Sequence, residues 1–349
     1  MDVWEKSIKI VPFDKYIAEV IDMKIALIGY GYWGPNLAKN LYINKNIEFV
    51  GICDQNLTKL KKAKEVYGEN IFYTTDYKEI MKDNSIDAVA IAVPTEYSYA
   101  IAMDALEVCK HVFIEKPIAS TMYRAQKLVD KAREKRLIIH CDHIMIYHPV
   151  IRYIKNMIDR GELGNLLYID ITRTNLGPIR KDINAMLDLA VHDIAVINYL
   201  AGNPDFRELS AMGEVCYGKQ ETLTFLNIKY DYFIANIKSS WISPIKERRT
   251  VVAGTKKMAI FDDVAIDNKL TIYDKGIDVK STDEYGEYEV HTRLGDIYIP
   301  HISNEDALQN SVTHFCECIS NHKESLSGPE QSLKVMKVLE QAMKQLQND

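Results

Sequence analysis

The sequence lacks the features that mark membrane-spanning, nucleic-acid-binding and disulfide-rich proteins. None of its apolar runs approaches the roughly 18 residues that suggest a membrane span. Its 43 Lys and Arg residues stand against 49 Asp and Glu residues, so the net charge is −6 and no basic face is implied. The six cysteines are scattered without a CxxC pair, which favours reduced thiols. We therefore expect a cytoplasmic protein that binds neither membranes nor nucleic acids.

The length of 349 residues is enough for two domains with cores of their own. Residues 1–22 mix acids and bases and resemble neither a signal peptide nor a basic arm. They form either a short packed appendage or a stretch upstream of the true start at Met23. We expect an extension over 1–22, a first domain over 23–145 and a second domain over 146–349, with the C-terminal helices packing back on the first domain.

The first domain alternates short apolar runs with helical segments. The runs lack polar alternation, as strands covered on both faces of a parallel sheet do, and they lie at 25–28, 49–53, 88–93, 112–114 and 137–139. Helices are expected at 57–67, ending at Gly68, at 98–110, and at 121–135 with Ser120 as N-cap. This order predicts a doubly wound parallel sheet of the Rossmann type.

The second domain has a different pattern. After a helix at 149–160, strands follow one another without helices between them, at 166–174, 208–217, 222–230, 233–242, 248–262 and 269–274. Such a series predicts a large open, mostly antiparallel sheet. Residues 276–303 are expected to form a long surface loop, and 305–347 a helical tail broken at 327–329. The fold class is therefore α/β, a Rossmann domain followed by an α+β domain.

A glycine-rich stretch, GYGYWGPN at 29–36, follows the first strand directly. Gly29 would permit the tight turn, Gly31 would let the backbone approach a pyrophosphate, and Gly34 would let the next helix pack closely. Asp54 ends the second strand, where a carboxylate can accept both ribose hydroxyls of an adenosine and repel a 2′-phosphate. The pattern predicts a dinucleotide site that prefers NAD over NADP.

Two aromatic residues lie inside this stretch, Tyr32 and Trp33. Either could cover the cofactor or pack between helix and loop, and packing is favoured for Trp33.

A second signal is Glu115-Lys116 after the strand HVFI, because ligands bind at the carboxyl edge of a doubly wound sheet. A lysine there can stabilise negative charge on a substrate oxygen, although an isolated Glu-Lys pair would more simply be a solvated strand end.

Taken with Asp54, the segments GYGYWGPN, AVPTEYS and ALEVCKHVFIEKPIAS resemble the glucose–fructose oxidoreductase/inositol dehydrogenase/MocA (Gfo/Idh/MocA) family. The resemblance continues through DRGELGNLLYI at 159–169 to the tail. It implies a nicotinamide cofactor held mostly by the first domain, contacts to that cofactor from Pro94, Thr95 and Glu115, and homodimers or homotetramers built on the second sheet. It also implies that Lys116 is catalytic and binds substrate.

The family pairs an Asp and a His four residues apart on a helix, and this sequence has Asp188 and His192. At that spacing both side chains lie on one helix face, and histidine exchanges protons near neutral pH. Taken alone, the pair would more simply be a surface feature. With the resemblance, we interpret His192 as the proton acceptor and Asp188 as the residue that orients it. Asp193 is expected to face away.

The stretch NLGPIRKDIN at 175–184 precedes this helix and resembles the branch of UDP-N-acetylglucosaminuronate 3-dehydrogenases. Asn175, Arg180 and Asn184 offer amides and a guanidinium, which suit hydroxyls and a carboxylate or diphosphate. The alternative for Arg180 is a solvated loop charge. Tyr147 would line the sugar pocket or pack at the domain junction.

A cluster of metal-ligand residue types at 140–148 does not predict a metal site. On a continuing strand His140 and Asp142 would face one way and Cys141 and His143 the other, so the set would not converge.

The favoured hypothesis is an NAD-dependent oxidoreductase acting on C3 of a nucleotide-linked hexose or hexuronate. The alternatives are an inositol or free-sugar dehydrogenase, a 3-ketosugar reductase, and a non-catalytic NAD-binding sensor or structural protein.

Overall fold

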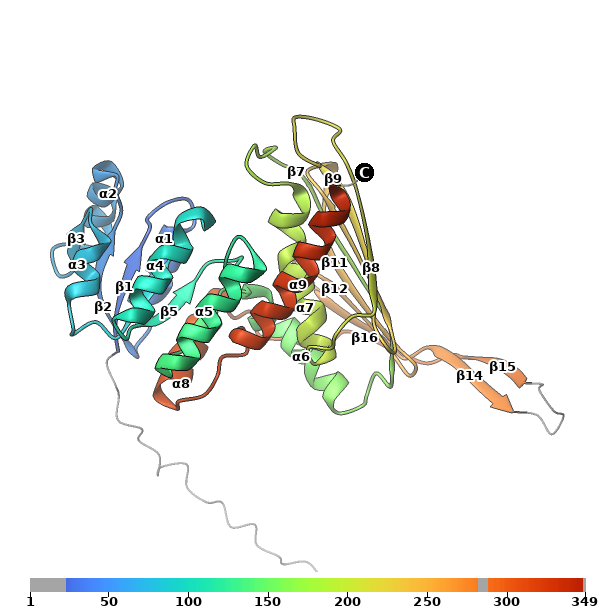
Figure 1. The fold of residues 1–349 in the computed structure, drawn as a ribbon. Helices are drawn as coiled ribbons and strands as arrows, with labels where there is room; N and C mark the ends of the chain where they lie inside the picture. The colour runs from blue at the N-terminus through green and yellow to red at the C-terminus, as the bar shows by residue number, and fades with distance from the viewer. Residues whose placement is uncertain (1–22, 282–287, 348–349) are drawn as a thin grey trace, which may run out of the picture.

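The computed structural model describes residues 23–281 and 288–347, which are organised around two large sheets (Figure 1). The expectation for residues 1–22 lies outside the described residues. Among the helices of the described part, none has the length and apolarity to cross a bilayer.

The first sheet is parallel and has the strand order β3-β2-β1-β4-β5-β6. Its strands are β1 (Met23–Ile28), β2 (Ile47–Cys53), β3 (Phe72–Thr74), β4 (Ala88–Ile91), β5 (His111–Ile114) and β6 (Ile139–Cys141). Helices α1 (Gly34–Ile43), α2 (Leu57–Tyr67), α3 (Tyr77–Lys82), α4 (Thr95–Glu107) and α5 (Met122–Lys135) connect them. The order reverses between β1 and β4, which creates the switch point where such sheets bind ligands.

The second sheet has the order β16-β13-β12-β11-β7-β10-β9-β8 and is antiparallel except where β10 pairs with β7. Its strands are β7 (Leu166–Leu176), β8 (Glu208–Glu214), β9 (Leu223–Lys229), β10 (Ile234–Ser240), β11 (Ile242–Gly254), β12 (Met258–Asp262), β13 (Leu270–Tyr273) and β16 (Ile297–Tyr298). The α/β class, with a parallel Rossmann sheet and a mostly antiparallel second sheet, is thereby confirmed.

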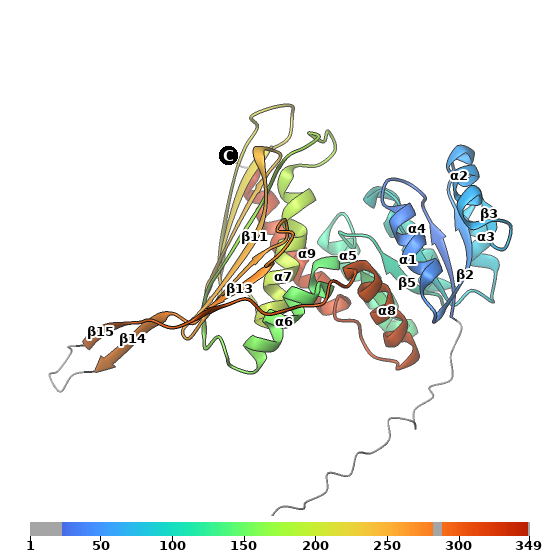
Figure 2. The ribbon, with the colours of Figure 1, turned by 180° about the vertical axis from the view of Figure 1, so that it is seen from behind.

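Helices cover one face of the second sheet, and the other face is bare in both views (Figures 1 and 2). The covering elements are α6 (Pro149–Asp159), the π-helical segment η2 (Met186–Ala190), α7 (Val191–Ala201) and α9 (Pro329–Leu346), and the 3-10 turn η1 (Ile144–Tyr147) leads into α6 beside α7. Strand alternation produces the two faces, since Ala235 and Ile237 of β10 are buried while Ile234 on the same strand is 51% exposed. A hairpin of β14 (Gly276–Ser281) and β15 (Tyr288–Arg293) projects from the sheet as an arm (Figure 1).

Helix α8 (Ala307–Ser320) returns to the first sheet. Its Leu308, Val312 and Phe315 belong to the same apolar cluster as Leu27 of β1 and Leu37 of α1. The C-terminal helices therefore connect the two sheets, because α9 packs against β8 and α7 at the other end of the tail.

Several predicted boundaries were wrong, each for a local reason. Thr121, not Ser120, caps α5, because its Oγ1 accepts the Arg124 amide hydrogen at 3.2 Å. Strand β3 was missed because it has only three residues. The stretch 248–262 is two strands, and 276–303 contains β14, β15 and β16 rather than a loop alone. Alternation that runs on through a short turn does not mark where one strand ends.

Candidate functional site

The glycine-rich stretch lies at the switch point and leaves no room for larger residues at two positions. Gly29 has a φ of +102°, and a Cβ there would lie 2.4 Å from the Ala92 carbonyl oxygen at the end of β4. A Cβ on Gly34 would lie 2.5 Å from the Gly29 carbonyl oxygen, so Gly34 brings α1 close to the turn. Gly31 is different, because only the Lys59 Nζ comes within 4 Å of its ideal Cβ, at 3.9 Å. The turn is thus tight on the protein side and open at Gly31.

Asp54 lies beside this turn and is held by main-chain donors. Its carboxylate accepts the Tyr30 and Asn56 amide hydrogens, each at 2.8 Å, and lies 3.5 Å from the Lys59 Nζ. Asp54 and the start of α2, residues 54–59, line a surface hollow. The acid is therefore fixed in place next to the glycine turn, where an adenosine ribose would reach it.

The two aromatic residues of the turn behave differently. Trp33 packs against the core beneath the sheet, while Tyr32 is 98% exposed and contacts none of that core. Pro94 and Thr95 lie at the start of α4, directly after the end of β4. Helix α1 begins without a side-chain cap, so its first amides remain available to an anion.

Lys116 joins the two halves of the molecule. It follows β5 of the first sheet, and its Nζ donates to the Asp188 carbonyl oxygen at 3.0 Å and lies 3.7 Å from Asp188 Oδ1. Both side chains are partly exposed, 20% for Lys116 and 22% for Asp188. Burial lowers the pKa of the lysine, and the Asp188 and Glu115 charges oppose that shift. Because its pKa is lowered, Lys116 exchanges a proton more readily than a solvated lysine does.

His192 lies in the first turn of α7, near Lys116, and its Nδ1 is buried without a hydrogen-bond partner. Burial moves the pKa of the imidazole well below its usual value, and the positive charges of Lys116 and Arg173 add to the shift. The imidazole is therefore neutral at physiological pH and able to accept a proton. Positions 116 and 192, far apart in the sequence, are near enough in space for the Lys116 charge to act on the imidazole.

The expected role of Asp188 as the partner of His192 needs correction. The segment around Asp188 is the π-helical η2, and regular α-helix begins only at Val191. The Asp188 carboxylate contacts Lys116 and the Arg180 Nη1, at 3.7 and 3.5 Å, while the His192 Nδ1 has no partner. The i, i+4 argument assumed a continuous α-helix and so assigned the carboxylate to the wrong neighbour.

Sequence reasoning set Asp193 aside and missed its partner Arg173. Arg173 of β7 donates through Nη2 to Asp193 Oδ1 at 2.6 Å and through Nε to both carboxylate oxygens, at 2.9 and 3.0 Å. The pair is buried, and it ties the start of α7 to the second sheet directly behind His192. The sequence signal was a lone arginine within a strand, which by itself does not distinguish a buried ion pair from a solvated charge.

The residues expected to bind substrate divide into two groups. Arg180 is exposed and reaches Asp182 and, in η2, Asp188, and Asn175 is partly exposed near the end of β7. Tyr147 and Asn184 are buried instead. Tyr147 is fully buried with its hydroxyl 2.9 Å from the Ser327 Oγ, and Asn184 is 1% exposed, accepting the Leu187 amide hydrogen at 2.9 Å. Packing and support of η2 account for these two, so neither is available to a sugar.

Buried polar atoms without partners gather around Lys116. They belong to Glu115 (Oε1), His143 (Nδ1 and Nε2) and His192 (Nδ1). Burial lowers the pKa of His143 to about 3, and Lys116 contributes to that shift. Such atoms cost free energy unless water or a ligand satisfies them. Together with the open Gly31, the uncapped α1 and the fixed Asp54, they fit the binding of a nicotinamide dinucleotide at the carboxyl edge of the first sheet.

Comparison with known proteins agrees with this geometry. Residues 23–143 match the model of the oxidoreductase family Gfo/Idh/MocA with an NAD-binding Rossmann fold, and residues 151–260 match the family's C-terminal domain model. Together the two matches cover about two thirds of the chain.

The curated relatives are distant. An uncharacterized oxidoreductase of Streptococcus pneumoniae is 23% identical over 60% of this chain and 59% of its own length, so the match spans about three fifths of that relative. A UDP-N-acetylglucosamine 3-dehydrogenase of Acidithiobacillus ferrooxidans is 26% identical over 74% of this chain and 79% of its own. An inositol 2-dehydrogenase of Salmonella typhimurium is 25% identical over 58% and 60%.

A solved structure extends the likeness to the whole fold. GenD2 from gentamicin A biosynthesis, in complex with NAD, superimposes with a TM-score of 0.78 at 18% identity, over 97% of each chain. At that identity the likeness concerns the fold alone.

Proposed function

The chain belongs to the Gfo/Idh/MocA oxidoreductase family, and we propose that it transfers a hydride between a sugar hydroxyl carbon and NAD. The observation that carries this proposal is the meeting of Lys116, from the edge of the Rossmann sheet, with the start of α7 that bears His192. NAD, when bound, accepts the hydride. All other chemistry falls to side chains of this protein.

His192 takes the hydroxyl proton as the hydride leaves the neighbouring carbon. Its imidazole is neutral and therefore able to accept that proton, although burial beside positive charges makes it a weaker base than a solvated histidine. The Lys116 ammonium polarises the same oxygen and stabilises the charge that develops on it. Asp188 positions Lys116 through its carbonyl and carboxylate oxygens. Arg173 and Asp193 fix the start of α7 and act on the reaction only through His192.

The preference for NAD over NADP is argued from Asp54. Its carboxylate is held by two amide hydrogens and would lie against a 2′-phosphate, which repels it. Lys59, at 3.5 Å from the same carboxylate, reduces that repulsion without removing it.

For the substrate we favour a nucleotide-linked hexose or hexuronate oxidised at C3. Arg180 beside η2 offers a guanidinium for an anion, Asn175 offers an amide for hydroxyls, and a relative of 26% identity is named a UDP-N-acetylglucosamine 3-dehydrogenase. A second candidate is a polyol such as inositol, which the relative named inositol 2-dehydrogenase supports. A non-catalytic NAD-binding protein is the alternative of another class, and the Lys116 and His192 arrangement argues against it.

The second sheet offers a surface for self-association. Its bare face carries Tyr168, Phe225 and Ile234, which are 41%, 38% and 51% exposed. We infer a homodimer or homotetramer that covers this face.

The decisive experiment compares four variants on a panel of UDP-sugars and inositols, with reduced nicotinamide followed by absorbance. We expect Lys116→Ala and His192→Ala each to lower kcat by about 100-fold or more. Lys127→Ala and His322→Ala, matched changes on the surface, should leave kcat unchanged. NADH binding by fluorescence confirms that each variant is folded. Full turnover in both site variants would refute the assigned roles, and no reduction with any panel member would favour the non-catalytic alternative.

A further inference from the structure

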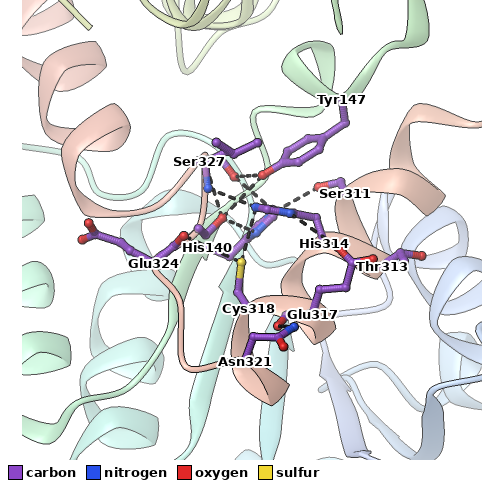
Figure 3. A network of polar contacts seen from close by, with 12 residues as sticks. His140, Tyr147, Ser311, Thr313, His314, Glu317, Cys318, Asn321, Glu324 and Ser327 are labelled. Carbon is purple, nitrogen blue, oxygen red and sulfur yellow. Dashed lines mark hydrogen bonds and ion pairs between the residues drawn. The ribbon is translucent and has the colours of Figure 1, made fainter. Parts of the chain in front are cut away.

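A chain of buried hydrogen bonds runs from the candidate site toward the loop between α8 and α9 (Figure 3). Ser311 of α8 lies between Asp142 and His140, 2.8 Å from Asp142 Oδ1 and 2.9 Å from the His140 Nε2. The His140 Nδ1 lies 2.9 Å from the Ser325 Oγ. We call Asp142, Ser311, His140 and Ser325 the buried relay. The exposed fraction of its members is 7% or less.

The chemistry of the groups sets the direction of each bond when Asp142 is ionised. A carboxylate only accepts, so the Ser311 hydroxyl donates to Asp142 and must itself accept from His140. The His140 Nε2 then carries the hydrogen, and Nδ1 accepts from the Ser325 hydroxyl. Burial keeps the pKa of His140 well below its usual value, so the ring is neutral and has a single N–H. If Asp142 is protonated, every bond can reverse, and the hydrogen moves to Nδ1.

The other end of the buried relay reaches Glu115. Strands β5 and β6 are parallel neighbours with Ile114 opposite Cys141, and the next residue along each strand is Glu115 and Asp142. Two carboxyls side by side in a buried place do not both ionise readily. Burial raises the pKa of Asp142 to about 7, and burial followed by the Asp142 charge raises that of Glu115 well above its usual value. The pair therefore holds a proton at physiological pH.

We propose that Glu115 and Asp142 store one proton beside Lys116 and exchange it through the buried relay with the loop at residues 321–328. This inference rests on the proposed function. Glu115 and Asp142 are not catalytic residues, because they act through Lys116. The arrangement would give the proton that accompanies each hydride a route between the hydride-transfer site and the loop at residues 321–328.

The proton movement balances without any electron transfer. In carbonyl reduction the substrate oxygen gains its proton from His192, Lys116 returns a proton to the imidazole, and the stored proton of the pair then replaces the one that Lys116 has lost. The Ser325 hydroxyl proton moves to the His140 Nδ1, the Nε2 proton to Ser311, and the Ser311 hydroxyl proton to Asp142 Oδ1. Water at the exposed residues 321–324 reprotonates Ser325. Alcohol oxidation runs the same steps in reverse.

Other charged and titratable groups face the buried relay and affect the pH at which Asp142 and His140 change their protonation. Lys116 favours the Asp142 carboxylate, and Asp306 at the start of α8 disfavours it. His314 of α8 and His143 act on His140. Cys141, Tyr147 and Cys318 are buried beside it, and burial raises the pKa of each thiol and of the phenol, so all three stay neutral.

The test is the tautomer of His140 in the full-length protein, read by nitrogen NMR of labelled histidine from about pH 5 to about pH 9 without substrate. His140→Gln identifies the signal. We expect the hydrogen on Nδ1 at low pH and on Nε2 at high pH, with the change near neutral pH. Asp142→Asn should abolish the change, and Ser311→Ala should uncouple the ring from Asp142. Ser332→Ala is the matched control, because Ser332 is a buried serine outside the buried relay, bonded to the Ser327 carbonyl oxygen at 3.2 Å.

One His140 tautomer at every pH in the wild-type protein would overturn the proposal, even if no variant folded. The proposal would also be overturned if the His140 tautomer changed with pH in Ser311→Ala just as it does in the control Ser332→Ala. Because the measurement needs no substrate, its failure leaves the proposed dehydrogenase activity standing. A switching tautomer in a protein that oxidises no sugar would instead refute the proposed function alone.

Discussion

At the scale of single residues, most of the candidate site depends on groups whose charge is set by burial and by neighbouring charges. Asp54 is held beside the glycine turn by the amides of Tyr30 and Asn56, which fixes a negative charge at the place where an adenosine ribose would lie. His192 is neutral because it is buried near positive charges. These surroundings allow predictions for individual substitutions.

Asp54→Ser should raise the affinity for NADPH relative to NADH by about 10-fold or more, because the repulsive carboxylate is removed while Lys59 remains to meet a 2′-phosphate. Fluorescence titration of both reduced cofactors measures the ratio. Glu48→Ser, which removes an exposed acid from β2, the strand that leads to Asp54, should leave the ratio unchanged. An unaltered ratio in Asp54→Ser would show that the acid does not face the ribose.

His111 should make the protein less stable in acid. Its Nδ1 accepts the Ile138 amide hydrogen at 2.9 Å, which only the neutral ring can do, and burial lowers its pKa to about 4. Between pH 6.5, the usual value for unfolded histidine, and about pH 4, the unfolded chain binds more protons than the folded one. The unfolding free energy contributed by this group is therefore present above about pH 6.5 and lost as the pH falls.

Denaturant unfolding at a series of pH values measures this effect. His111→Asn, whose amide oxygen can accept the same hydrogen bond without titrating, should show a shallower loss of stability in acid. The exposed His301→Asn should follow the wild type. Equal slopes for wild type and His111→Asn would contradict the assignment.

At the scale of elements, the start of α7 is the critical piece. The π-helical η2 leads into it, Asn184 supports η2 through the Leu187 amide, and the Arg173–Asp193 pair holds the first turn to β7. The position of His192 follows from these three supports. A change in any of them should move the imidazole without touching it.

Asp193→Asn should lower the unfolding free energy by about 3 kcal/mol, because it leaves the Arg173 guanidinium buried without its counter-charge. Denaturant unfolding measures the change. Asp231→Asn provides the matched control, since Asp231 pairs with Arg207 on the surface, where both side chains are more than half exposed. There the effect should stay within about 1 kcal/mol. Similar losses in the two variants would mean that the buried pair contributes no more than a surface one.

At the scale of the whole molecule, three contacts join the parts built on the two large sheets: Lys116 reaches η2, α8 returns to the Rossmann core, and α9 packs on α5. These contacts leave one face of the second sheet without a helix of the described residues over it. Its exposed apolar side chains come from β7, β10 and β9, which are neighbours in the sheet. A face of this kind is typically covered by another protein surface.

Ile234→Asp should therefore reduce the oligomer that we infer to monomers, because a carboxylate on the inferred interface would be buried without a partner. Light scattering coupled to size-exclusion chromatography measures the mass. Leu57→Asp on α2, also an exposed apolar residue, should leave the mass unchanged. A wild-type protein that is monomeric at micromolar concentration would refute the inferred interface.

Local features account for the parts that could be predicted from the sequence. Unbroken apolar runs marked the parallel strands, and the Gly29–Gly34 turn followed by Asp54 identified the cofactor edge, since each signal lies within a single strand–turn–helix unit. Helix α2 was predicted with its bounds and its terminal Gly68. Lys116 and His192 were selected because the family resemblance supplied what spacing alone could not.

Only the tertiary structure decided which side chains meet. The Asp188 contact with Lys116, the Arg173–Asp193 pair and the link from Asp142 through Ser311 to His140 join residues 20 to 171 positions apart in the chain. Burial has the same origin, and it is burial that makes His192 neutral and turns Tyr147 away from any ligand. Sequence patterns describe neighbours along the chain, whereas pKa values and hydrogen-bond partners depend on neighbours in space.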